Sequence, residues 1–206
     1  MRKIITIGRE FGSGGRELGR RLSEHLGIAY YDQEIIAEIA KRTALSEAYV
    51  RQITENRPLT SFPIHFGGRF CALPDPLLQQ SLSIYSEQHR LLCELAEKSD
   101  CIIVGRCGNY IFRHRSDLVS VFLKGREADR IRAVAAEEGV TPRKAAAIVH
   151  DMDDSRVRYH MYYTHLQWGN SADYDLCFDS VRLGTEKSVA LIGQYIEGLG
   201  IRRKEA

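Results

Sequence analysis

Long hydrophobic runs and paired cysteine motifs are missing from this chain of 206 residues. No apolar stretch approaches the roughly 20 residues of a membrane-spanning helix, and Met1-Arg2-Lys3 leads into a strand-like segment without a signal-peptide core. The five cysteines are odd in number and form no C-x-x-C pair, which argues against a disulfide framework or a cysteine zinc site. We therefore expect a cytoplasmic protein with no membrane partner.

An excess of charge is also missing, since 29 Lys and Arg face 27 Asp and Glu and the net charge is +2. A dedicated nucleic-acid binder normally has a strongly basic domain, so we expect no nucleic-acid partner. Lysine is scarce, because 22 of the 29 basic residues are arginine. Arginine grips phosphate or carboxylate with a planar fork, but codon bias in a GC-rich genome also explains this composition.

The pattern of apolar residues predicts an α/β protein in a single domain over 1–206. A β-branched run at 3–7, a glycine-rich turn at 8–15 and a helical pattern after it predict strand, loop and helix in that order. Further strands are expected at 28–31, 101–104, 118–123 and 176–178, and further helices around 35–39, 77–98, 127–138, from 142 onward, and 186–197. Five short strands separated by helices predict a three-layer fold with a five-stranded parallel sheet.

Proline is scarce outside one segment. Four of the five prolines lie at 58–76, together with Gly67-Gly68 and several aromatic side chains. We interpret this segment as a loop or insertion that interrupts the alternation of strands and helices.

The turn between the first strand and helix has the composition of an anion-binding loop. Its glycines leave backbone N–H groups free to surround a phosphate, and the following helix adds its dipole; the alternative is a tight turn that uses glycine only for positive φ. We assign a phosphate-bearing cofactor to Gly12, Ser13, Gly14, Gly15, Arg16 and Glu17.

The loop departs from the P-loop pattern G-x-x-x-x-G-K-[ST]. With Gly14 as the second glycine, Gly15 takes the lysine position. With Gly15 as the second glycine, Arg16 takes the lysine position and Glu17 the Ser/Thr position, so the usual lysine and hydroxyl are missing either way. We expect Arg16 to supply the positive charge on the donor phosphates.

Several segments occur in an order that resembles the cytidylate kinase-like family of P-loop proteins over nearly the whole chain. They are Gly12 to Arg16, Tyr30-Tyr31-Asp32, Ile103-Val104-Gly105-Arg106, Val121-Phe122-Leu123, Asp153-Asp154-Ser155-Arg156 and Tyr174-Asp175-Leu176-Cys177-Phe178-Asp179-Ser180. The resemblance implies a nucleoside monophosphate kinase fold, with an acceptor-binding insertion at about 45–98 and a lid region at about 126–168. It also implies ATP and Mg²⁺ as cofactors and small-molecule nucleotides as partners.

Arginines carry most of the site that the resemblance implies. Arg106 matches the arginine of the family's Asp-Gly-Arg-Asp segment, which contacts the acceptor, and Arg156 keeps the D-x-x-R spacing of the lid with Asp153. Arg158 is a second lid candidate, and Arg130 is assigned with Asp153 to the acceptor. A surface arginine after a strand and an exposed i, i+3 helix pair are the alternatives for Arg106 and for Asp153 with Arg156.

Asp32 is the carboxylate that remains to bind the acceptor and to hold Mg²⁺, and helix capping before Gln33 is its alternative. Gln33-Glu34 and Ala37-Glu38 replace the family's acceptor-binding residues after it, and Val104 and Cys107 replace the two acids around Arg106.

These residues lead to one main hypothesis, ATP-dependent phosphoryl transfer to a nucleoside monophosphate, first of all CMP or dCMP, with Arg16, Arg106, Arg156 and Arg158 as catalytic residues. A nucleotide-binding protein that has lost transfer, or a kinase of another small acceptor, are the alternatives. The sequence makes no prediction of oligomeric state.

Overall fold

The computed structural model describes residues 3–56 and 76–199. Five strands form one sheet, β1 (Ile4–Arg9), β2 (Ala29–Tyr31), β3 (Cys101–Val104), β4 (Leu118–Lys124) and β5 (Leu176–Asp179). The longer helices are α1 (Gly15–Leu26), α2 (Glu34–Thr43), α4 (Pro76–Lys98), α6 (Glu127–Glu138), α7 (Pro142–Thr164) and α9 (Thr185–Gly198). The short ones are α3 (Glu47–Arg51), the π-helix η1 (Gln52–Asn56), α5 (Gly108–Ile111), the 3₁₀ turn η2 (Ser171–Asp173) and α8 (Ser180–Leu183).

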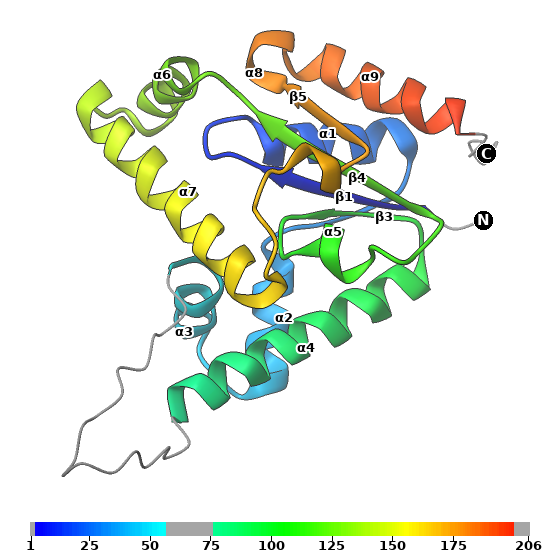
Figure 1. Cartoon of the computed structure of the whole chain (residues 1–206), viewed down its shortest axis with the longest axis vertical. Helices are drawn as coiled ribbons and strands as arrows, with labels where there is room; N and C mark the ends of the chain where they lie inside the picture. The colour runs from blue at the N-terminus through cyan, green and yellow to red at the C-terminus, as the bar shows by residue number, and fades with distance from the viewer. Residues whose placement is uncertain (1–2, 57–75, 200–206) are drawn as a thin grey trace.

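All strand pairs are parallel, and the sheet order is β2-β3-β1-β4-β5. Helices α1 and α9 cover one face, and α2, α4 and α5 lie against the other (Figure 1). The predicted three-layer α/β fold with a five-stranded parallel sheet is thereby confirmed. The predicted proline-rich segment at 58–76 lies outside the described residues except for Pro76, where α4 begins.

The strands alternate their side chains between two apolar cores. Ile5 and Ile7 of β1 pack with Leu18 and Leu22 of α1 on one face, whereas Ile4 packs with residues of α2 and α4 on the other. Thr6 and Gly8 therefore belong to the second face, where α7 and the turn after it also lie. This alternation decides which β1 residues can reach the functional site.

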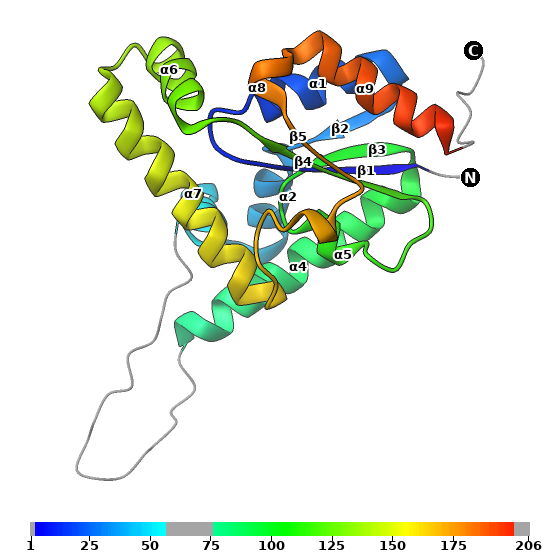
Figure 2. The same cartoon turned by 45° about the horizontal axis from the view of Figure 1, so that its top comes forward.

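Helix α7 crosses in front of the carboxyl ends of the central strands (Figures 1 and 2). It begins at Pro142, as predicted, with Thr141 as its N-cap, whose hydroxyl accepts a hydrogen bond from the Lys144 N–H, and it continues to Thr164. In open parallel sheets the crevice outside the carboxyl ends binds ligands, so α7 closes the position where a site is expected.

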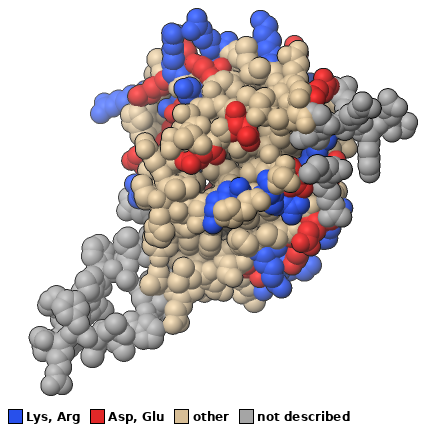
Figure 3. Space-filling view, turned by 45° about the vertical axis from the view of Figure 1, so that its right-hand side comes forward, with Lys and Arg blue, Asp and Glu red and all other residues tan. Residues whose placement is uncertain are grey.

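Within the described ranges, no helix is long and apolar enough to cross a membrane. Basic and acidic side chains are interspersed on the face seen in Figure 3. The cysteines that the structure describes, Cys93, Cys101, Cys107 and Cys177, are free thiols.

Helix α4 offers a matched test of the packing. Ile84 is 1% exposed in the core between α4 and the sheet, whereas Leu82, two residues earlier, is 49% exposed. We expect Ile84→Ala to lower the free energy of unfolding by about 2 to 5 kcal/mol because it leaves a cavity. Leu82→Ala should change it by less than about 0.5 kcal/mol, as surface substitutions do. Urea denaturation of both variants measures the difference, and equal losses would contradict the placement of α4.

Candidate functional site

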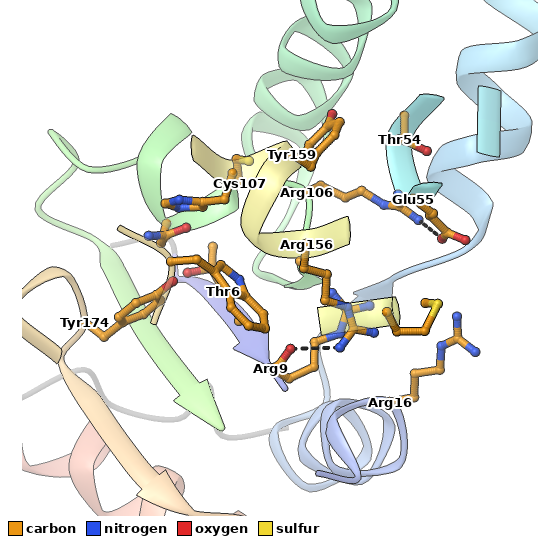
Figure 4. Close-up of a pocket in the computed structure, with 16 residues that line it drawn as sticks. Thr6, Arg9, Arg16, Thr54, Glu55, Arg106, Cys107, Arg156, Tyr159 and Tyr174 are labelled. Carbon is orange, nitrogen blue, oxygen red and sulfur yellow. Dashed lines mark hydrogen bonds and ion pairs between the residues drawn. The ribbon is translucent and has the colours of Figure 1, made fainter. Parts of the chain in front are cut away.

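A pocket lies where β1 and β3 end, between the sheet, η1 and α7 (Figure 4). Four of its 16 lining residues are arginines, Arg9, Arg16, Arg106 and Arg156. Glu55 of η1 is the acidic residue among them. Arginines far apart in the sequence therefore meet in one pocket with a surplus of positive charge.

Arg16 and Asp32 contact each other directly. The Arg16 Nε atom lies 2.9 Å from Asp32 Oδ2, and the Asp32 carboxylate is almost completely buried. The guanidinium also donates to the Gln33 side-chain oxygen when that amide faces it, at 3.0 and 3.2 Å. Helix α2 has Gln33 as its N-cap, without a side-chain cap, so the alternative that Asp32 caps this helix is wrong.

Arg106 follows β3 in an unusual backbone conformation. Gly105, Arg106 and Cys107 all have positive φ, at 75°, 58° and 54°, and the two that are not glycine are strained in this region. The Arg106 carbonyl accepts a hydrogen bond from the Gln88 amide at 3.1 Å, and Gln88 in turn accepts from the Tyr159 hydroxyl. This buried network holds the turn that places Arg106 in the pocket.

The Arg106 side chain is buried and ion-paired. Its Nη2 atom lies 2.7 Å from Glu55 Oε1, and its Nε–H has no hydrogen-bond partner. Buried polar groups are normally satisfied. The unpaired Nε–H is therefore a donor that a ligand in the pocket can use, and the surface-arginine alternative does not hold for Arg106.

Arg9 is a pocket residue that the sequence patterns missed. Its side chain runs against Gly15, whose added Cβ would lie 2.8 Å from Arg9 Cγ, and reaches Gly105, whose Cβ would lie 1.9 Å from Arg9 Nη1. Neither position can hold a side chain while Arg9 stays there. One sequence signal could have pointed to Arg9. The loop has no lysine where the P-loop pattern has one, and a glycine at that position leaves space for a cationic side chain from another part of the chain.

Arg156 approaches the same loop from α7. Its Nη1 donates to the Arg9 carbonyl oxygen at 2.9 Å, and its guanidinium lies 5.3 Å from the centre of the Phe11 ring. Asp153 is 3.7 Å away, and the Arg156 side chain is only 19% exposed. Arg156 and Asp153 are therefore not a freely exposed helix pair.

Burial and mutual repulsion destabilise the charged form of these guanidiniums. Burial lowers the pKa of Arg9 to about 9, with Arg156, Arg106 and Arg16 adding to the effect and Asp32 opposing it. Burial likewise lowers the pKa of Arg156 to about 10, with Asp153 and Glu55 opposing the effect and Arg16 and Arg106 adding to it. An anion in the pocket would relieve both effects.

The glycine loop lies beside this pocket and leads into α1. Gly12 and Gly14 have φ of 78° and 75°, which glycine adopts without strain, and no side chain caps α1. The Ser13 hydroxyl donates to the Glu10 carbonyl at 2.8 Å, so it stabilises the loop itself. The Ser180 hydroxyl donates to the Ser13 carbonyl at 2.7 Å. The loop thus combines the left-handed glycines of a turn with an uncapped helix N-terminus.

Arg130 and Asp153 brace the loop from outside the pocket. Arg130 Nη1 lies 2.6 Å from Asp153 Oδ2 and donates to the Phe11 carbonyl at 2.9 Å, while Asp153 Oδ1 accepts from the Phe11 N–H at 2.7 Å. The Arg130 Nε atom also lies 3.3 Å from Glu10 Oε2. Neither residue lines the pocket, so the structure places both against the loop and not at the predicted acceptor position.

Glu17 and Arg158 also lie apart from the pocket. Glu17 is on the exposed side of α1, where it pairs with Arg20 and Arg21. Arg158 is two residues after Arg156, about 200° around the helix, and its exposed side chain is 4.0 Å from Asp154. We predicted that these two residues contact phosphate, but in the structure they form exposed ion pairs outside the pocket.

Asp32 retains one feature suited to a metal. Its buried Oδ1 atom has no hydrogen-bond partner, although Arg9 Nη2 is 3.8 Å away. The described residues contain no group of three or more His, Cys, Asp or Glu side chains placed to hold a metal. Kinase Mg²⁺ is commonly held by one or two carboxylates together with substrate phosphates, and Asp32 fits that limited role.

The brace around Phe11 generates a test. We expect Arg130→Met to speed hydrogen exchange at the Phe11 amide and to lower the free energy of unfolding by about 2 kcal/mol, because charge-assisted hydrogen bonds are lost. Arg132→Met, on the exposed side of the same helix, is the matched control. Mass-spectrometric exchange over the loop measures the effect, and unchanged exchange in Arg130→Met would rule out the brace.

Comparisons with known proteins agree with this architecture. A solved structure of an uncharacterized protein from Eubacterium ventriosum ATCC 27560 is 27% identical, with a TM-score of 0.72 over 95% of this chain and 99% of that one. Shikimate kinase from Bacteroides thetaiotaomicron, at 15% identity, covers 95% of this chain and 98% of its own with a TM-score of 0.56. That level of identity establishes likeness of fold.

Sequence comparison gives the family. A "Cytidylate kinase" from Methanopyrus kandleri (strain AV19) is 23% identical over 205 residues, covering 95% of this chain and 94% of that protein. The model of the cytidylate kinase-like family matches residues 4–182, which include the glycine loop and all four pocket arginines. This chain belongs to the cytidylate kinase-like family.

Proposed function

We propose that this protein transfers the terminal phosphoryl group of ATP to a small anionic acceptor, with CMP and dCMP the first acceptors to test. The observation that carries the proposal is the convergence of Arg9, Arg16, Arg106 and Arg156 on one pocket at the carboxyl edge of the sheet. Phosphoryl transfer depends on positioning and on neutralising charge, which such a group of guanidiniums provides. Family membership supports the same activity.

The glycine loop is the donor side of the proposed site. The amides of Gly12 to Gly15 and the dipole of α1 would bind ATP phosphates, and ATP would supply the phosphoryl group. Arg16 lies at the start of α1, with its Nε 2.9 Å from Asp32. Asp32 would in turn hold Mg²⁺, which neutralises phosphate charge in kinases. Arg9 occupies the space that Gly15 leaves, so it stands in for the absent loop lysine.

The acceptor side consists of residues from three segments. Arg106 after β3 and Arg156 of α7 would bind the acidic group of the acceptor, and Glu55 sets the position of the Arg106 guanidinium. An acceptor phosphate needs no strong base and no covalent nucleophile. The region at about 45–98, with η1 and α4, serves as the acceptor-binding insertion in this proposal, and about 126–168, with α6 and α7, as the lid.

An ADP-release assay with a panel of acceptors tests the function. We expect Mg²⁺-dependent ADP release above the ATP-only rate with a nucleoside monophosphate, and we expect CMP or dCMP to be the best of them. Shikimate and gluconate belong in the panel because the altered residues after Asp32 permit another acceptor. ATP binding without turnover on any acceptor would contradict the proposal and indicate a nucleotide-binding protein.

Arg16 and Arg21 provide a matched pair on α1. Arg21 is exposed and pairs with Glu17, whereas Arg16 lines the pocket. We expect Arg16→Ala to lower kcat/KM by about 10²-fold or more, the usual cost of losing a group that stabilises transferring charge. Arg21→Ala should leave it within about twofold. Steady-state kinetics with ATP varied measures both, and equal activities would refute the role of Arg16.

A further inference from the structure

The pocket extends beyond the arginines along the face of the sheet. Figure 4 shows Thr6, Cys107 and Tyr174 on one side of it and the labelled arginines with Glu55 on the other. On the Thr6 and Tyr174 side we define an inner subsite by five pocket-lining residues, Thr6, Asn109, His160, Trp168 and Tyr174. No charged side chain belongs to this set, so its chemistry differs from that of the arginine side.

Two polar atoms of the inner subsite are buried without a partner. Thr6 and His160 are 2% and 4% exposed, and neither Thr6 Oγ1 nor His160 Nε2 makes a hydrogen bond. In the described part of the chain, the other buried side-chain atoms in this state are Arg106 Nε, in the same pocket, and Asp32 Oδ1, whose carboxylate does not line the pocket but pairs with the pocket residue Arg16. Since buried polar groups are normally satisfied, their concentration here points to a ligand that satisfies them.

The hydrogen bonds of His160 determine what its free nitrogen can do. Its Nδ1 lies 3.1 Å from the Leu166 carbonyl oxygen, which can only accept, and 3.1 Å from Thr164 Oγ1. The Thr164 hydroxyl donates its proton to the His160 carbonyl oxygen at 2.7 Å, so Nδ1 carries the ring proton. The neutral ring then presents Nε2 as an acceptor. Burial lowers the pKa of His160, which favours the neutral form, whereas the Leu166 bond and Asp173 act in the opposite direction. The free Nε2 atom therefore requires a donor from the ligand.

The position of Thr6 follows from the alternation of β1 side chains between the two faces of the sheet. Ile5 and Ile7 point into the core with α1, so Thr6 faces α5 and α7. Its methyl group packs towards Gly108, where an added Cβ would lie 2.9 Å from Thr6 Cγ2. The hydroxyl remains unpaired in the pocket and can donate or accept.

Aromatic rings limit the shape of the inner subsite. The two aromatic rings of the subsite, Trp168 and Tyr174, both pack against Phe122 of β4. The ring centre of Phe122 lies 5.2 Å from that of Trp168, in an edge-to-face arrangement, and 5.0 Å from that of Tyr174. An added Cβ at Gly8 would meet Phe122 at 2.8 Å and the Tyr174 hydroxyl at 3.2 Å, so the approach of these rings requires glycine. This wall suits a compact, uncharged group.

We propose that the inner subsite selects the acceptor by binding its uncharged end, through a hydroxyl or N–H group that donates to His160 Nε2 and a second polar group at Thr6. The acidic end lies at Arg106 and Arg156. The acceptor class is thus a small organic anion with a hydrogen-bond donor opposite its acid. The assignment of this ligand as the acceptor rests on the proposed function, whereas the binding itself does not.

Isothermal titration calorimetry measures binding without turnover, and a choice of probes distinguishes binding at the inner subsite from binding at the arginines. The probes are CMP, shikimate and gluconate, which carry donor groups away from their acids, and inorganic pyrophosphate, which engages only the arginines. The variants are His160→Phe, which removes the acceptor; His160→Gln, whose amide oxygen can replace it; and Thr6→Val, which replaces the hydroxyl with a methyl group of similar size.

We expect His160→Phe and Thr6→Val each to weaken the best-bound organic anion roughly tenfold, the scale of one hydrogen bond with its partner left unpaired. His160→Gln should stay within about threefold of the parent protein, and pyrophosphate should bind all forms within about twofold. Should His160→Phe fail to fold, as judged by circular dichroism, Thr6→Val still decides.

Organic-anion binding that is unchanged in His160→Phe and Thr6→Val would overturn the inference, as would a parent protein that binds pyrophosphate but none of the three organic anions. Equal losses in His160→Gln and His160→Phe would also count against it, since they indicate a purely structural histidine. If the parent protein binds an organic anion selectively but releases no ADP with it, the kinase proposal is rejected and the binding subsite stands.

Discussion

Four guanidinium groups are confined beside the carboxyl edge of the sheet, and their repulsion is the constraint around which the site is built. Asp32 pairs with Arg16, Glu55 pairs with Arg106, and the Arg9 carbonyl accepts from Arg156. These contacts offset part of the repulsion, and burial still lowers the pKa of Arg9 and Arg156. A pocket with this balance is stabilised by a ligand of opposite charge, because binding to the folded state shifts the folding equilibrium.

The backbone accommodates the arginines through small residues and strain. Gly15 and Gly105 leave space for Arg9, and the left-handed run from Gly105 to Cys107 directs Arg106 into the pocket. Such strain persists only where the surroundings hold it, and Gln88 with Tyr159 does so here. The glycines of this site therefore serve two purposes: they form a turn around the loop, and they admit an arginine where the usual pattern has lysine.

Much of the fold could be predicted because apolar periodicity is strong at 101–104, 118–123 and 127–138, where the observed elements begin and end within a residue of expectation. Short elements escaped prediction. The π-helix η1, which supplies Glu55, has no periodic signature, and α5 follows a left-handed turn that only the folded chain shows.

The site was predictable where a residue follows a strand or begins a helix, as Arg106 and Arg16 do. Arg156 and Arg158 could not be separated without the phase of α7, which turns one towards the loop and the other to solvent. Arg9 and His160 were missed because their positions in the pocket come from packing. Arg9 depends on two distant glycines, and His160 on a carbonyl six residues further along the chain.

The most direct test of the account is a crystal structure of this protein with a non-hydrolysable ATP analogue and an acceptor bound together. We expect the analogue's phosphates at the amides of Gly12 to Gly15 and at Arg16, with the acid of the acceptor between Arg106 and Arg156. Phosphates bound elsewhere, or an empty arginine pocket at saturating ligand, would contradict it.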